Sequence, residues 1–162
     1  MEIKLRNLTE ADRPHLINLL SRIKEFTAED REIALTVIDI FLYEPERETN
    51  YFVIATTVED QIIGFACYGE AWITDRTFEL YWIAVDPDYA SKGIGTLLLK
   101  GVEKGVADLK GRMIVLETSS RPEYAAARYF YLKNNYGIVS TIKDFYHDGE
   151  DKVTFVKYHL LS

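Results

Sequence analysis

The chain has 162 residues, of which 48% are hydrophobic, and its formal net charge is -7 at pH 7. This length suffices for one well-buried domain, and no linker-like composition divides it, so residues 1–162 are expected to form a single domain. The acidic balance argues against nucleic acid as a partner, and no apolar run is long enough for a membrane span. No signal peptide follows Met1 and Cys67 is the single cysteine, so we expect a cytoplasmic protein.

The first part of the chain predicts one strand and two helices. Alternation over Ile3–Arg6 indicates a half-buried strand, and Thr9 with Asp12 resembles the capping box that starts a helix. The apolar face of this helix is expected to hold Leu16, Leu19, Leu20 and Ile23. A second helix is expected from about Asp30 to Leu42, with Pro45 as its end.

An acidic segment runs from Glu25 to Glu48 and includes the second helix. Its acidic residues outnumber the basic Arg31 and Arg47, and they are Glu25, Glu29, Asp30, Glu32, Asp39, Glu44, Glu46 and Glu48. On the residues alone, this pattern is typical of a solvated helix face.

The middle of the chain predicts three strands and a helix. Tyr51–Val58 and Gln61–Gly69 are two β-rich runs joined through a tight connection, which indicates an antiparallel hairpin. The run Leu80–Val85 lacks alternation, as expected for a strand covered on both faces, and Asp86-Pro87 ends it. The helix that follows is predicted from the helical spacing of Ile94, Leu97, Leu98 and Val102.

The last part predicts a strand, a helix and a closing hairpin. Met113–Thr118 is a short apolar run suited to a buried parallel strand, because the preceding helix makes a crossover. A helix is expected from near Pro122, with Ala127, Phe130 and Tyr131 on one face, ending at Asn134–Gly137. Ile138–Tyr146 and Lys152–Leu160 are expected to pair about His147-Asp148-Gly149.

Two glycines stand at the predicted start of the helix that follows Leu80–Val85. The first amides of a helix have no intrahelical partner, and glycine lets a phosphate approach them closely. The sequence therefore predicts a pyrophosphate site over Ser91–Thr96. A tight strand-to-helix turn, with Gly93 and Gly95 needed only for packing, is the alternative that this pattern leaves open.

The sequence around this turn resembles the acetyl-CoA-binding motif of the GNAT acetyltransferases. The resemblance rests on Ala84–Tyr89 followed by Lys92–Leu98, and Gly93 and Gly95 match the family's glycine positions. Ala90 stands where the family usually has Arg or Gln, so a side-chain contact to the phosphates is in doubt there. Lys92 could supply a compensating positive charge. The resemblance implies that the cofactor loop comprises Ser91, Lys92, Gly93, Ile94, Gly95 and Thr96.

A second part of the resemblance lies in the helix Arg128–Lys133. Tyr131 matches the family tyrosine that often stands near the thioester sulfur, so it is the candidate acid for the departing thiolate; core packing is the alternative. The asparagine of the family motif falls on Tyr124 here, which puts that cofactor contact in doubt. The order of elements matches the GNAT fold, an α/β (α+β) architecture with a mixed, mostly antiparallel sheet of about seven strands and about four helices. Its middle strands are expected to splay around the cofactor.

Acetyl transfer to an amine requires a base, because alkyl amines have a pKa of about 10.4. Glu79 resembles the strand-borne glutamate that part of the family uses, although a strand-end glutamate is often only exposed or ion-paired. Alternation places it on one face with Tyr81, Ile83 and Val85. Glu70 or Glu117 could serve if Glu79 faces away. Unpaired strand amides at Ile83, Ala84 and Val85 are expected to hold the pantetheine and polarise the thioester carbonyl.

The predicted function is N-acetyl transfer from acetyl-CoA to a primary amine. The resemblance allows the acidic segment to select a cationic small molecule or peptide, and it also allows a homodimer. A non-catalytic acyl-CoA-binding module of the same fold and an unrelated acidic interaction domain are the alternatives. No metal is expected, because His15, His147 and His159 lack the spacing of metal ligands.

Overall fold

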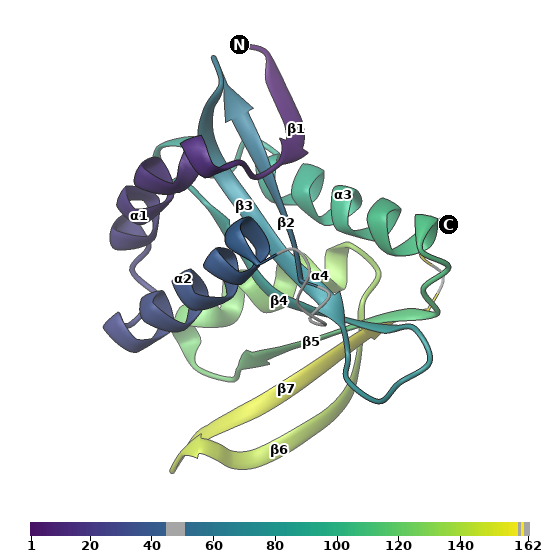
Figure 1. Cartoon of the computed structure of the whole chain (residues 1–162). Helices are drawn as coiled ribbons and strands as arrows, with labels where there is room; N and C mark the ends of the chain where they lie inside the picture. The colour runs from purple at the N-terminus through teal and green to yellow at the C-terminus, as the bar shows by residue number, and fades with distance from the viewer. Residues whose placement is uncertain (45–50, 159, 161–162) are drawn as a thin grey trace.

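A computed structural model describes residues 1–44, 51–158 and 160. These residues form one seven-stranded sheet in the order β1-β2-β3-β4-β5-β7-β6. Helices α1 and α2 pack on one face of the sheet, and α3 and α4 pack on the other (Figure 1). Only β4 and β5 run parallel; the other neighbouring strands are antiparallel. The predicted mixed, mostly antiparallel sheet with four flanking helices is confirmed.

The strands are β1 Ile3–Asn7, β2 Tyr51–Val58, β3 Gln61–Glu70, β4 Thr77–Val85, β5 Met113–Ser119, β6 Gly137–His147 and β7 Glu150–Lys157. The α-helices are α1 Arg13–Arg22, α2 Ala28–Tyr43, α3 Ile94–Asp108 and α4 Ala125–Lys133. Short 3-10 turns precede three of them, at Glu10–Asp12, Pro87–Tyr89 and Pro122–Tyr124.

Several element boundaries differ from the sequence prediction by a few residues. Helix α2 starts at Ala28 rather than near Asp30, because Thr27 and Asp30 form a capping box that the periodicity did not reveal. The amide of Asp30 donates to the Thr27 hydroxyl at 3.1 Å, and the amide of Thr27 donates to the Asp30 carboxylate at 2.9 Å. The last strand ends at Lys157. Pro45, the expected end of α2, lies outside the described residues.

Helix α3 packs against the first strands of the sheet with two glycines at the contact. A Cβ atom added to Gly101 would come within 2.6 Å of Leu5, and one added to Gly105 within 2.2 Å of the Tyr68 hydroxyl. A Cβ atom at either position would force the facing side chain to move, so glycine allows α3 to pack closely against Leu5 and Tyr68. The helix that begins at the glycine turn is thereby fixed to the β1–β4 side of the sheet.

The sheet divides into two arms between β4 and β5. These strands pair only at Thr77–Glu79 with Met113–Val115, after which β5 pairs with β7 alone. We call β1–β4 the first arm and β5, β7 and β6 the second arm. Residues Leu80–Val85 pair with β3 on one side, while their other edge faces the gap and is not paired by β5. The predicted splay of the middle strands is confirmed.

A β-bulge at Tyr81 corrects the predicted facing of β4. Leu80 pairs with Tyr68 and Trp82 pairs with Cys67, so Tyr81 is an extra residue on β4. The insertion reverses the alternation. Ile83 and Val85 therefore pack in the core under α3 and α4, whereas Tyr81 packs toward α1 and α2. The expectation that Glu79, Tyr81, Ile83 and Val85 share one face was wrong for Ile83 and Val85.

Candidate active site

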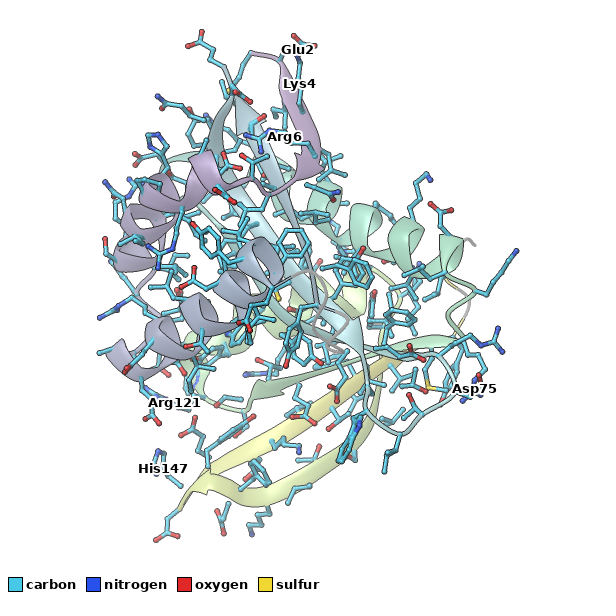
Figure 2. The ribbon with its side chains drawn as sticks, in the orientation of Figure 1. Glu2, Lys4, Arg6, Asp75, Arg121 and His147 are labelled. Atoms are coloured by element: carbon cyan, nitrogen blue, oxygen red, sulfur yellow. The ribbon has the colours of Figure 1, made fainter. Side chains whose placement is uncertain are left out.

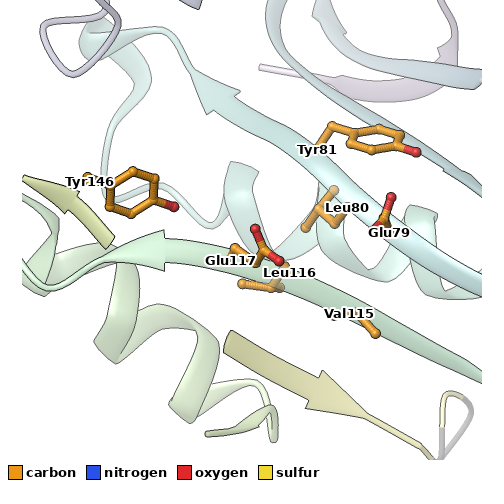
Figure 3. Close-up of a pocket in the computed structure, with 7 residues that line it drawn as sticks. All are labelled: Glu79, Leu80, Tyr81, Val115, Leu116, Glu117 and Tyr146. Carbon is orange, nitrogen blue, oxygen red and sulfur yellow. The ribbon is translucent and has the colours of Figure 1, made fainter. Parts of the chain in front are cut away.

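A cavity of about 340 Å³ lies where the two arms separate. Its lining comes from both arms and consists of Glu79, Leu80, Tyr81, Val115, Leu116, Glu117 and Tyr146 (Figure 3). Leu80 and Leu116 belong to the core under α3 and α4 and form an apolar part of the lining. The carboxylates of Glu79 and Glu117 give the cavity its charged groups. Convergent polar groups of this kind are a common feature of small-molecule sites.

The two carboxylates of the cavity differ in their partners. Glu117 forms an ion pair with Lys152 at 3.1 Å, and the Lys152 ammonium also lies 4.3 Å from the centroid of the Phe145 ring. The charge of Glu117 is thus already offset by a cation of its own chain. Glu79 is half-buried, and its carboxylate lies beside the Tyr81 hydroxyl. Of the three carboxylates considered from sequence, Glu79 and Glu117 line the cavity and Glu70 does not.

Tyr146 reaches the cavity through an irregular part of β6. Between the paired positions Ile142 and His147, residues 143–146 of β6 stand opposite Asp151 alone. Asp144 adopts a left-handed backbone with φ 56°, and its amide donates to the Asp151 carboxylate at 3.0 Å. Tyr146 is a cavity residue that the sequence did not predict, because nothing in the alternation of β6 indicates this bulge.

Burial and nearby carboxylates raise the pKa of two tyrosines of the cavity, Tyr81 and Tyr146, and of Tyr124 in the turn before α4. Burial is the main cause for Tyr81, and Glu79 adds to it. Burial, Glu117 and Glu150 raise the pKa of Tyr146. Burial, and then Asp30, raise the pKa of Tyr124. In all three, burial is the largest cause and the carboxylates add to it.

The glycine turn leaves its helix terminus open. Ser91 and Gly93 adopt left-handed φ values of 61° and 78°, and no atom lies within 4 Å of the position that a Gly93 Cβ would occupy. Residues 90–93 and Thr96 are exposed, while Ile94 is buried and anchors the start of α3. Lys92 lies 5.4 Å from the centroid of the Tyr89 ring. The amides at the start of α3 are thus accessible to a phosphate, as the proposed cofactor loop requires.

Ion pairs with the last residue of α1 stabilise the turn that follows β4. The Asp86 carboxylate accepts from the amide of Asp88 at 2.9 Å and forms an ion pair with Arg22, the last residue of α1. Arg22 also pairs with Asp88 at 3.2 Å. These contacts join the end of α1 to the residues that directly follow β4. Nothing in the sequence pattern pointed to Arg22.

Tyr131 is not among the residues that line the cavity. It is 8% exposed and packs in the core under α3 and α4, with its ring 5.6 Å from Phe155 and 6.0 Å from Tyr136. Burial raises its pKa, so the hydroxyl stays protonated through the neutral range. Leu80, part of the cavity lining, belongs to the same apolar cluster. Tyr131 and Glu79 therefore lie on opposite faces of the sheet.

Two carboxylates of the acidic segment, Asp30 and Asp39, have structural roles. Asp30 caps α2, and Asp39 forms an ion pair with Arg13 at 2.7 Å. Glu46 and Glu48 lie outside the described residues. Tyr124, at the family's asparagine position, donates its hydroxyl to the carbonyl of Glu25 at 3.2 Å, which links the turn before α4 to the α1–α2 connection.

The turn before α4 and the tip of the β6–β7 hairpin lie on one side of the molecule, as Arg121 and His147 show in Figure 2.

Within residues 1–44, 51–158 and 160, no group of three His, Cys, Asp or Glu side chains is arranged to hold a metal ion; His159 is outside these ranges. None of the described helices combines the length and apolar character that a membrane crossing needs.

Comparisons with known proteins agree with this geometry. Residues 47–138 match the family of acetyltransferase (GNAT) domains. A protein from Desulfovibrio desulfuricans assigned to the GNAT family has a similar crystal structure, with a TM-score of 0.91 and 29% identity over 97% of this chain and 99% of that one. Among curated proteins, no sequence matches the chain.

More distant structures share the fold. The ribosomal-protein-S18-alanine N-acetyltransferase from Escherichia coli has a TM-score of 0.76 and 19% identity, covering 97% of this chain and 94% of that one. The PaiA N-acetyltransferase from Thermoplasma acidophilum, solved in complex with coenzyme A, has a TM-score of 0.74 and 20% identity, covering 98% and 100%.

Proposed function

From the premise that the chain belongs to the GNAT acetyltransferase family, we propose that it transfers the acetyl group of acetyl-CoA to a primary amine of a cationic small molecule or peptide. Members of the family are acetyl-CoA-dependent N-acetyltransferases. The observation that carries the proposal is the cavity between the two arms, which places Glu79 beside the unpaired edge of β4. We further propose that residues 1–162 act as one domain, since strands from both ends of the chain join a single sheet.

Acetyl-CoA is proposed to bind along the start of α3 and the free edge of β4. The pyrophosphate lies over Ser91–Thr96, where the exposed amides and the helix dipole favour an anion. Ala90 offers no charge there, so backbone amides and Lys92 carry the recognition. The pantetheine follows the edge of Ile83–Val85, whose backbone groups facing the gap are not paired by β5. This path leads the thioester toward the cavity.

The amine is proposed to enter from the α1–α2 face and the thioester from the α3–α4 face. Glu79 takes a proton from the ammonium, directly or through water, and the neutral nitrogen attacks the thioester carbonyl. Attack forms the C–N bond and a tetrahedral intermediate; as this collapses, the C–S bond breaks and the thiolate takes a proton from Tyr131. The nitrogen loses its second proton to water, and a proton from water restores the Tyr131 hydroxyl, so the products are the amide and the free thiol. The facing of Glu79 and Tyr131 on opposite sides of the sheet supports this division of roles. Glu117, whose charge is offset by Lys152, has no role in the proposed proton transfer.

Placement of the pyrophosphate can be tested with Gly93→Glu. The new carboxylate would repel the phosphates and fill the open space at the turn, so the Kd for acetyl-CoA should rise by a factor of about 10 or more, measured by calorimetry. The substitution also strains a left-handed residue. Gly149→Glu is a matched control, because Gly149 has φ 81° with no atom within 4 Å of its Cβ position. Equal affinities for the Gly93→Glu variant and the parent would refute the placement.

The cationic character of the acceptor predicts a salt dependence. Raising ionic strength from about 0.01 to 0.15 M shortens the Debye length from about 30 to 8 Å and weakens steering by exposed carboxylates. The KM of a cationic amine should therefore rise severalfold, while the KM of acetyl-CoA, measured in the same buffers, should change much less. An amine KM that does not respond to salt would remove the electrostatic part of the proposal.

A further inference from the structure

Three buried polar side chains form a network outside the cavity. Glu103 of α3 and Lys157 at the end of β7 are 1% and 4% exposed, and they form an ion pair at 2.8 Å. The hydroxyl of Tyr136, in the turn between α4 and β6, donates to the other carboxylate oxygen at 3.2 Å. Lys157 also donates to the carbonyl of Asn134 at 3.3 Å. Lys100 reaches Glu103 from the exposed side at 3.3 Å.

Stability alone does not account for this network. Taking two charges out of water costs free energy, and apolar side chains of similar volume are often as stabilising as a buried ion pair. A network of this kind differs from apolar packing in fixing distances and directions between the elements that it joins. The role of the network therefore depends on which elements it joins.

The network connects the two arms of the sheet. Helix α3 is packed onto the first arm and begins at the glycine turn, whereas Lys157 lies on β7 and pairs with Ile114 in the second arm. Between these arms, backbone pairing of β4 with β5 stops at Glu79 and Val115. Asn134 and Tyr136 come directly after α4, and the Tyr136 ring contacts that of Tyr131 edge-on at 6.0 Å.

We propose that Glu103, Lys157 and Tyr136 are positioning residues for acetyl transfer. They hold the second arm and the end of α4 at a fixed distance from α3, and so align Tyr131 with the thioester of acetyl-CoA bound at the start of that helix. This inference rests on the proposed function. A misplacement of about 1 Å at a reacting centre can cost up to about 100-fold in rate, so a remote network of this kind has a measurable effect.

The test replaces the network by apolar residues of similar size, with Glu103→Leu, Lys157→Met and Tyr136→Phe combined. The triple variant should fold with a thermal midpoint near that of the parent. Its kcat should fall about 10-fold and its Kd for acetyl-CoA should rise severalfold. The control is Lys104→Met with Asp108→Leu, which removes an exposed ion pair of 2.8 Å from the same helix and should leave both constants unchanged.

A folded triple variant with kcat and acetyl-CoA affinity within twofold of the parent would overturn the proposal. If that variant does not fold, Tyr136→Phe carries the same test, because it removes one hydroxyl and keeps the ring. It should lower kcat while leaving the KM of the amine unchanged; an unchanged kcat would overturn the proposal equally. A parent that binds acetyl-CoA but releases no thiol with any amine refutes the proposed function alone, and the affinity comparison still decides whether the network positions the arms.

Discussion

Glu79→Gln is expected to lower turnover near neutral pH by roughly 100-fold or more, the scale of general base catalysis. Glutamine keeps the size of the side chain and its place in the cavity, but it cannot accept the proton of the ammonium. The loss should shrink as pH approaches the pKa of the amine itself, about 10.4 for an alkyl amine, because the neutral nucleophile then forms without a base. The measurement is the pH profile of kcat/KM for both proteins with one good amine.

Two other glutamates provide comparisons for this experiment. Glu70→Gln makes the same change at the end of β3, where the carboxylate accepts from the amide of Arg76 at 2.9 Å, and its profile should match that of the parent. Glu117→Gln removes a charge from the same cavity and should raise the KM of the amine without moving the profile. Superimposable profiles with equal rates for Glu79→Gln and the parent would exclude Glu79 as the base.

Tyr131→Phe is expected to reduce kcat by roughly 100-fold, with little change in the Kd of acetyl-CoA. The substitution keeps the ring that packs against Phe155 and removes only the hydroxyl that is proposed to protonate the thiolate. Because burial raises the pKa of Tyr131, this proton remains available across the neutral range. Steady-state kinetics, with calorimetry for the affinity, separate the two effects.

Tyr129→Phe is the matched control for this change. Tyr129 lies on the same helix but is 68% exposed, so loss of its hydroxyl should not alter kcat. If Tyr131→Phe retains turnover within a factor of two of the parent, the tyrosine serves packing only, and the thiolate is protonated by another group or by water.

The sequence predicted the architecture well where local patterns and burial agree. The unalternating run Leu80–Val85 does lie in a strand with both faces covered, β4. The helical spacing from Ile94 to Val102 also placed α3 correctly, and Asp148-Gly149 forms the turn of the predicted β6–β7 hairpin. In each case the local residue pattern reflects a single physical constraint, which is either the position of the core or the geometry of a turn.

The details of the site depend on features that sequence spacing does not encode. The bulge at Tyr81 is set by how β4 pairs with β3, and it overturned the predicted facing of Ile83 and Val85. The bulge that brings Tyr146 to the cavity depends on Asp144, which is paired through Asp151 on the next strand. Such contacts join residues that lie far apart in the chain or alter pairing without changing the hydrophobic pattern.

The most direct test of the account is a thiol-release assay with acetyl-CoA over a panel of primary amines, including alkyl amines, polyamines, aminoglycosides and peptides with free N-termini. Each amine is compared with its hydroxyl analogue and with a reaction that lacks acceptor. At least one cationic amine should raise thiol release well above this background, with an equal amount of N-acetylated product detected by mass spectrometry. Binding of acetyl-CoA by calorimetry with no amine-dependent thiol release would contradict it and indicate an acyl-CoA-binding protein without transferase activity.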